Sequence, residues 1–171
     1  MILRLSQKLS ARIKVSSPKA MPLDDNPFAD WTAHLFYVER TQYVIVSNTQ
    51  SLYSTVFYGT GISYDSKFIV RALGAIREFM EDDGQAFAYH HFIIPASGIV
   101  SFGKALDRSV TGSMNELINF AKSWLSGGEM APHEVGFKLN DVLLSSLARG
   151  TTDSYRKPRE AFKDMLSASA S

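Results

Sequence analysis

This chain of 171 residues contains no cysteine and therefore no thiolate nucleophile or metal ligand. A transition-metal or acid–base site would therefore have to be built from its histidines. Two of its four histidines, His90 and His91, are adjacent. The surrounding residues predict a strand, on which neighbouring side chains point to opposite faces and cannot chelate one ion. One of the pair could meet His34 across the sheet. His34, His90 and His91 are therefore weak catalytic candidates, and we predict no metal site and no cofactor.

Other catalytic and nucleotide-binding motifs lack the spacing that their chemistry requires. His133-Glu134 begins like the zinc-binding helix of a metalloprotease, but the second ligand position is Phe137 and the segment alternates like a strand. Gly59-Thr60-Gly61 lacks the third glycine of a dinucleotide-binding loop and is interpreted as a turn. The chain has no G-x-x-x-x-G-K-[ST] phosphate loop and no G-x-S-x-G nucleophile elbow. Enzymatic activity is therefore not the favoured interpretation.

Charge is distributed unevenly along the chain, although the formal net charge is only +1. The first 23 residues contain five cations and no acid, whereas the remainder contains 13 cations and 17 acids. This pattern fits a transit peptide, a functional basic edge, or a first strand and short helix with solvated cations, and we favour the last. The cations at Arg4, Lys8, Arg12 and Arg40 nevertheless make nucleic acid an alternative partner.

The densest strand signal lies between residues 31 and 58. Trp31–Glu39, Tyr43–Asn48 and Leu52–Tyr58 are rich in aromatic and β-branched residues. Their connections are too short for a crossover, so the three strands are predicted to form an antiparallel meander. Large apolar side chains occur at both the odd and the even positions of the first strand, which point to opposite faces of the sheet. This predicts either that other elements of the chain cover both faces or that one apolar face binds a partner. A protein partner, or self-association as a homodimer, is predicted on the second alternative.

Helices and further strands are predicted around this meander. An apolar stripe at helical spacing predicts a helix over Ser66–Glu81, and Ser113-x-x-Glu116 has the form of a capping box for a helix ending near Leu125. The remaining predicted elements are a strand over Met1–Ser6, a helix over Gln7–Lys14, strands over Ala86–Ile94, Ile99–Phe102 and His133–Leu139, a short helix from Asn140 or Asp141 to Leu147, and a helix over Pro158–Leu166.

These elements predict an α+β fold in which two main amphipathic helices and short C-terminal helices pack on an antiparallel or mixed sheet. Residues 1–171 are expected to form a single domain, with 149–171 as a C-terminal linker and helix. No run of apolar residues is long enough for a membrane span, so no membrane partner is expected. The absence of cysteine is compatible with a reducing cytoplasm.

Several short motifs resemble a bacterial family of unknown function. The chain opens with M-I-x-R-x-[ST]-x-K, continues with W-x-A-x-L from Trp31 and a strand ending in Asn48, and carries C-terminal L-N and P-x-E-x-F elements at Leu139 and Pro158. The resemblance implies a bacterial cytoplasmic protein but no established activity. Six residues match the family pattern: Arg4, Lys8, Trp31, His34, Arg40 and Asn48. If the protein has a ligand or phosphate site, we expect it to be formed by these residues.

Three functions remain open at this level. The favoured one is a non-catalytic binding or protein-interaction module. The second is a nucleic-acid-associated protein of a mobile-element or toxin–antitoxin type of system. The third is a hydrolase or nuclease that uses His34, His90 or His91 together with Arg40.

Overall fold

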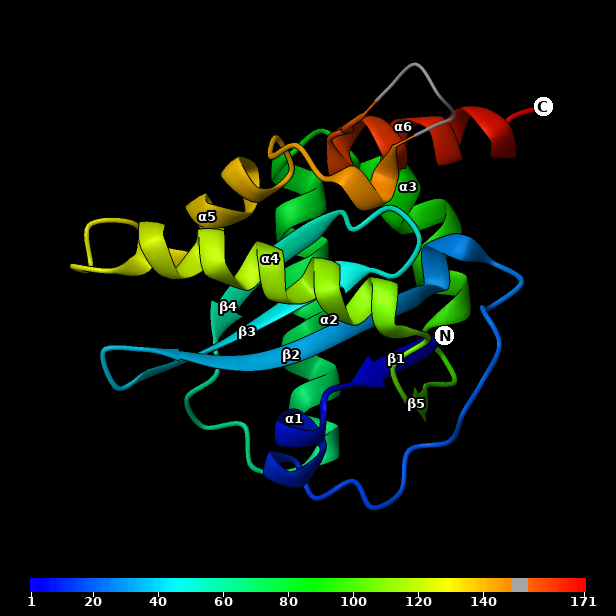
Figure 1. Cartoon of the computed structure of the whole chain (residues 1–171). Coiled ribbons are helices and arrows are strands. Elements are labelled where there is room, and N and C mark those ends of the chain that lie inside the picture. The colour runs from blue at the N-terminus through cyan, green and yellow to red at the C-terminus, as the bar shows by residue number, and fades with distance from the viewer. Residues whose placement is uncertain (149–153) are drawn as a thin grey trace.

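One mixed sheet organises the chain in the computed structural model, which describes residues 1–148 and 154–171 (Figure 1). Its five strands follow the order β4-β3-β2-β1-β5. β1 runs parallel to both of its neighbours, β2 and β5, whereas β2, β3 and β4 form the predicted antiparallel meander. The strands are β1 (Ile2–Leu5), β2 (Asp30–Val38), β3 (Thr41–Asn48), β4 (Ser54–Tyr58) and β5 (Ser101–Gly103).

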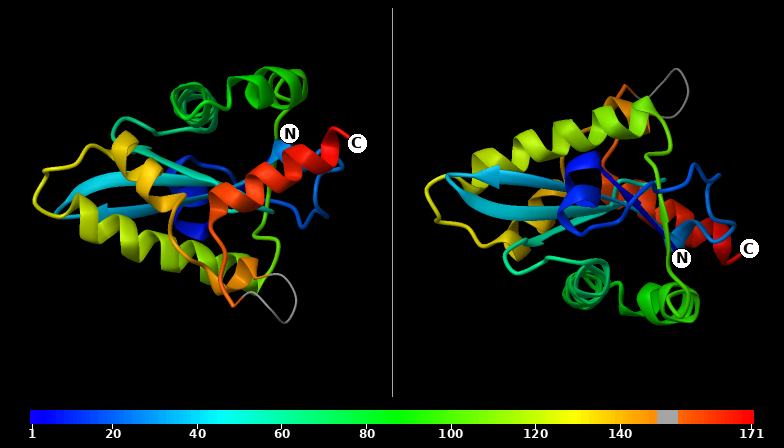
Figure 2. Two further views of the ribbon diagram at one scale, coloured as in Figure 1. Left: turned by 90° about the horizontal axis from the view of Figure 1, so that it is seen from above. Right: turned by 90° about the horizontal axis from the view of Figure 1, so that it is seen from below.

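Helices cover both faces of this sheet, with α2 on one side and α4 on the other (Figure 2). The predicted α+β class is thereby confirmed, and the sheet is mixed. None of the helices in the described parts of the chain is both long and apolar enough to cross a membrane. The α-helices are α1 (Gln7–Arg12), α2 (Asp65–Asp82), α3 (Ala86–Ala88), α4 (Arg108–Leu125), α5 (Pro132–Leu139) and α6 (Pro158–Ser169).

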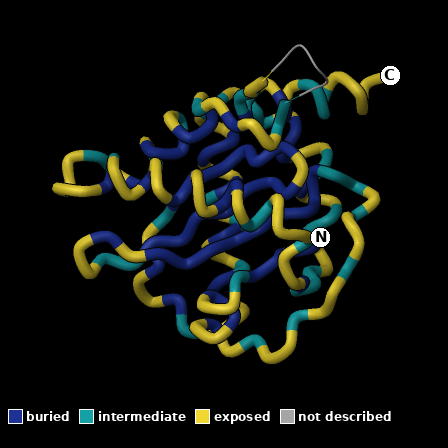
Figure 3. The backbone as a smooth tube through the Cα atoms, viewed as in Figure 1, coloured by how far each residue is buried: buried dark blue, intermediate teal, exposed yellow. Residues whose placement is uncertain are grey.

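Because helices cover both faces of the sheet, β2 carries large apolar side chains on both of its faces. Leu35 belongs to the core between the sheet and α2, whereas Phe36 belongs to the core between the sheet, α4 and α5. β2 and β3 are consequently buried over most of their length (Figure 3). The chain's own helices cover the face on which self-association was predicted. The apolar side chains on both faces of β2 therefore give no support to a dimer through the meander.

The segment Ala86–Ile94 is helical, and the predicted strand there is wrong. It forms α3, followed by one π-helical turn over Tyr89–Ile93 and a 3₁₀ turn. Its buried residues Ala88, Tyr89 and Ile93 do not alternate as strand residues do, and they close the core against α2. The open edge of β1 is paired instead with Ser101–Gly103, which includes the end of the predicted strand at Ile99–Phe102.

The segment His133–Leu139 is also a helix, α5, and not the predicted strand. Pro132 occupies its first position, where the fixed φ of proline suits a helix and no backbone hydrogen bond is lost. The Glu134 carboxylate accepts a hydrogen bond from the backbone N–H of Ala131, and Val135 and Leu139 are buried one turn apart. The apparent alternation of this short segment also fits a helix, and tertiary burial selects the helix.

The limits of other predicted helices need smaller corrections. α4 begins at Arg108 and is capped by Asp107, whose carboxylate accepts from the N–H of Val110, so Ser113 is not its capping residue. The predicted helix from Asn140 to Leu147 is reduced to a 3₁₀ turn over Ser145–Leu147. The predicted helices of residues 7–14, 66–81 and 158–166 are present as α1, α2 and α6, and part of the predicted linker, 149–153, lies outside the described residues.

Helices α5 and α2 approach each other closely at Gly136 and Phe79, and this contact can be tested by mutation. A Cβ added to Gly136 would lie 2.7 Å from Cε2 of Phe79, in the filled core. Gly136→Ala is therefore expected to lower the free energy of unfolding by about 1–3 kcal/mol through overpacking.

Gly74→Ala is the matched control, because Gly74 lies inside α2 with nothing within 4 Å of the added carbon. That substitution is expected to raise stability by up to about 1 kcal/mol. Urea unfolding measures both changes, and equal stabilities of the two variants would contradict the close contact.

Candidate functional site

Arg4, a predicted ligand-binding residue, is fully buried and bonded inside the fold. Its guanidinium forms a bidentate ion pair with Asp30, with both N–O distances at 2.8 Å. The same group donates to the backbone carbonyl oxygens of Met21 and Pro22, and more weakly to that of Lys104. This arrangement fastens the loop after α1 to β1 and β2, and the donors of Arg4 are used by the protein itself.

Trp31 and Asn48 also make internal contacts. The indole N–H of Trp31 donates to the carbonyl oxygen of Phe28 at 2.8 Å, and Trp31 is buried. The Asn48 amide donates to Pro27 and accepts from the backbone N–H of Ser51. These bonds shape the ends of β2 and β3, so neither side chain offers a polar atom to a ligand-sized space.

The structure does not bring the candidate histidines together. His90 and His91 lie in the π-helical turn beside α2, both exposed, with His90 3.5 Å from a carboxylate oxygen of Glu81. His34 lies on β2 in a groove that neither of them lines. Within residues 1–148 and 154–171, no group of three or more histidine or acidic side chains has a geometry that could hold a metal ion. Arg40 lies at the exposed β2–β3 turn, outside the groove.

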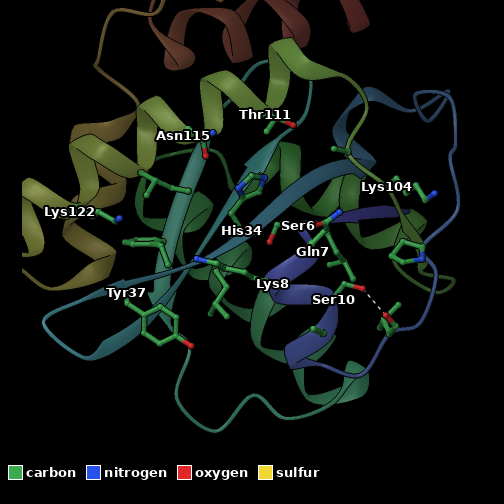
Figure 4. A pocket seen from close by; sticks show the side chains of 18 residues that line it. Ser6, Gln7, Lys8, Ser10, His34, Tyr37, Lys104, Thr111, Asn115 and Lys122 are labelled. Carbon is green, nitrogen blue, oxygen red and sulfur yellow. Dashed lines mark hydrogen bonds between the residues drawn. The ribbon is translucent and has the colours of Figure 1, made fainter.

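The groove lies where β1 ends and β2 continues at the edge of the sheet. It has a volume of about 1050 Å³ and is lined by α1 and its flanking residues, by the β2 segment His34–Tyr37, and by α4. Figure 4 shows the His34 ring between α4 and the start of α1. The volume lies just above the usual range for small-molecule sites, about 300–1,000 Å³. We call it the α1–α4 groove.

Positive charge dominates the α1–α4 groove. Lys8 on α1, Lys104 before α4 and Lys122 on α4 contribute to its lining, whereas none of the described aspartates or glutamates does. In the described parts of the chain, none of these three ammonium groups has a carboxylate within ion-pair distance. All three lysines are exposed. Their charges are therefore available to an anion that enters the groove.

His34 supplies a buried polar group to the groove wall. The residue is only 8% exposed, and within the described residues its ring has no hydrogen-bond partner. Burial lowers the pKa of His34 from 6.5 to about 4, so the imidazole is neutral near pH 7. A neutral imidazole carries one donor and one acceptor, and both are free for a ligand.

Sequence reasoning missed most of the residues in this groove. Of the predicted site residues, only Lys8 and His34 line it. Thr111, Asn115 and Lys122 contribute from one side of α4, at helical spacings of four and seven residues. This helical spacing can be recognised in the sequence. The three residues share one helix, however, only because α4 begins at Arg108, before Thr111.

Comparison with known proteins gives a family but no activity. A model of a protein family described as a domain of unknown function, DUF6933, matches residues 2–161. No curated protein matches the sequence. The family match spans nearly the whole chain, including every strand of the sheet and both walls of the α1–α4 groove. The chain therefore belongs to the DUF6933 family, a family of unknown function.

Proposed function

We propose that this protein is a non-catalytic binding module whose α1–α4 groove takes an anionic ligand. The observation that carries the proposal is a combination within the described residues: three lysines without a carboxylate partner and a buried His34 without a hydrogen-bond partner share a groove that none of the described acidic side chains lines. An anion entering between α1 and α4 gains attraction from the lysines, and the groove shields that attraction partly from water. The imidazole adds a directional hydrogen bond.

The same residues argue against a catalytic role for the groove. A histidine that acts as a general base needs a polar group to orient its ring and a nucleophile or substrate within reach. Among the described residues that line the groove there is no carboxylate that could orient His34, and burial lowers the pKa of His34 to about 4, which makes its ring a weak proton acceptor. His90 and His91 lie elsewhere. Binding, and not proton transfer, is the chemistry that this arrangement supports.

Calorimetric titration of the full chain with citrate and with tripolyphosphate at low salt tests the proposal. Saturable binding is expected, and affinity should fall as salt is raised. The triple variant Lys8→Gln, Lys104→Gln, Lys122→Gln should lose affinity by about ten-fold or more, because charge-assisted contacts are removed. Absence of binding by either anion and by an anionic peptide would overturn the proposal.

A second triple variant controls for net charge. Lys67, Lys138 and Lys163 are exposed and lie outside the groove lining, so their replacement by glutamine changes the total charge equally. This variant is expected to bind like the unmodified protein. Equal losses in the two triple variants would mean that the anions respond to overall charge and not to the groove.

A single-stranded oligonucleotide forms the third arm of the titration, because Lys8 and Arg12 are exposed cations of α1. A guanidinium nitrogen of Arg12 lies 3.5 Å from the side-chain oxygen of Gln42, near the turn that carries Arg40. Binding of the oligonucleotide that depends on Arg12 and Arg40 but not on Lys104 and Lys122 would favour a nucleic-acid surface over the groove.

A further inference from the structure

The floor of the α1–α4 groove is an unpaired edge of the sheet. β1 pairs with β2 only from Asp30 to Ala33, whereas β3 pairs with β2 as far as Val38. On the β1 side, the five residues His34–Val38 therefore have no strand neighbour among the described residues. Unpaired edges of this kind are templates for another strand.

Two hydrogen bonds show which backbone groups of β2 face the groove. The carbonyl of Asp30 accepts from Thr49 on the β3 side, and the carbonyl of Ala33 accepts from Ser6 on the β1 side. Because the direction of the backbone groups alternates along a strand, the N–H and C=O groups of Leu35 and Tyr37 also point to the β1 side. These groups form the floor of the groove.

The lining of the groove supports the same geometry. His34, Leu35, Phe36 and Tyr37 are four consecutive residues, and all of them line it. Successive side chains of a strand point to opposite faces, so a space on one face would contact only alternate residues. A space that contacts four in a row must reach the strand edge itself.

The groove also has the length of a short strand. Its α4 wall runs from Thr111 to Lys122, which corresponds to about 16 Å of helix at about 1.5 Å per residue. An extended peptide rises about 3.3 Å per residue, so about five residues fit along this wall. The free edge of β2 has the same number, His34–Val38.

We infer that the natural ligand of the groove is an extended acidic peptide segment of a partner protein, which adds to the sheet as a strand beside β2. Its backbone pairs with Leu35 and Tyr37, and its acidic side chains meet Lys8 on the α1 wall and Lys122 on the α4 wall. Lys104, before α4, meets an acid at the other end. This inference rests on the proposed anionic ligand and specifies its class.

A small anion and a peptide strand differ in their use of the backbone. Citrate satisfies the lysines and His34 but leaves the N–H groups of Leu35 and Tyr37 unpaired. A peptide pairs these donors and also supplies N–H groups to the facing carbonyl oxygens. Hydrogen–deuterium exchange at Leu35 and Tyr37 therefore distinguishes the two ligand classes.

The experiment uses libraries of acetylated, amidated peptides with glutamate at every second position and the other positions randomised. Peptides retained by the full chain are expected to slow amide exchange at Leu35 and Tyr37. Their binding should weaken about ten-fold when alternate backbone nitrogens that face β2 are methylated, since each methyl removes a ladder hydrogen bond. The groove triple variant Lys8→Gln, Lys104→Gln, Lys122→Gln should retain few of them.

Several results would overturn the inference while leaving the proposed function intact. These are retention of no acidic peptide although tripolyphosphate binds, peptide binding without protection of Leu35 and Tyr37, and unchanged affinity after backbone methylation. Equal retention of a library with lysine in place of glutamate would also contradict it.

Discussion

Replacing Arg4 with methionine is expected to lower the free energy of unfolding by about 3–5 kcal/mol, because it leaves the carboxylate of Asp30 buried without its counter-charge. Asp30 is 1% exposed and, among the described residues, keeps only the Thr49 hydroxyl and the Asp24 N–H as partners. Methionine retains much of the apolar stem of arginine, so the loss reports the broken ion pair together with the lost hydrogen bonds to the carbonyl oxygens of Met21 and Pro22.

Urea unfolding of the full chain measures this loss, with Arg12→Met as the matched control. Arg12 is exposed on α1, and its replacement is expected to change stability by less than about 0.5 kcal/mol. If Arg4→Met does not fold, Arg4→Lys keeps the charge without the bidentate geometry and should give an intermediate loss. Equal stabilities of the Arg4 and Arg12 variants would contradict a structural role for the Arg4–Asp30 pair.

Acid is expected to destabilise the protein through His34. Burial lowers the pKa of this residue in the folded state to about 4, whereas the unfolded chain titrates at the ordinary value of 6.5. Between these two values the unfolded state binds more protons, so the free energy of unfolding falls as the pH is lowered. The loss attributable to His34 is expected to approach about 3 kcal/mol at the lower end of this window.

The pH dependence of His34→Gln separates this contribution from that of the carboxylates. Glutamine cannot titrate, so the difference in stability between the unmodified protein and the variant should shrink or reverse between pH 6.5 and 4, the window set by the shifted pKa. His91→Gln is the control, because His91 is exposed. A His34→Gln variant whose stability follows the same pH curve as the unmodified protein would contradict burial of a neutral imidazole.

The meander and the long helices were predictable because their signals are local. Aromatic and β-branched residues with short connections require antiparallel neighbours, and the apolar stripe within Ser66–Glu81 requires a helix. The two misassigned segments, Ala86–Ile94 and His133–Leu139, are short, the first rich in apolar residues and the second alternating between polar and apolar ones. In such segments the choice between helix and strand depends on tertiary burial, here against α2 and β4.

The candidate site was less predictable than the fold, because its residues come from separate parts of the chain. Arg4 and Asp30 are 26 residues apart, and nothing local indicates that they pair in the interior. The basic N-terminus suggested an exposed surface, and only Lys8 of its cations contributes to the groove lining. Lys104 and Lys122 join it through the packing of α4 across the sheet edge, which no local pattern predicts.

Nuclear magnetic resonance of the histidine rings during a titration with tripolyphosphate tests the central claim most directly. The ring signals of His34 are expected to shift saturably, those of His91 should stay in place, and the groove triple variant Lys8→Gln, Lys104→Gln, Lys122→Gln should lose the response. Unmoved signals of His34, or the same response from the lysine variant, would contradict an anion-binding groove between α1 and α4.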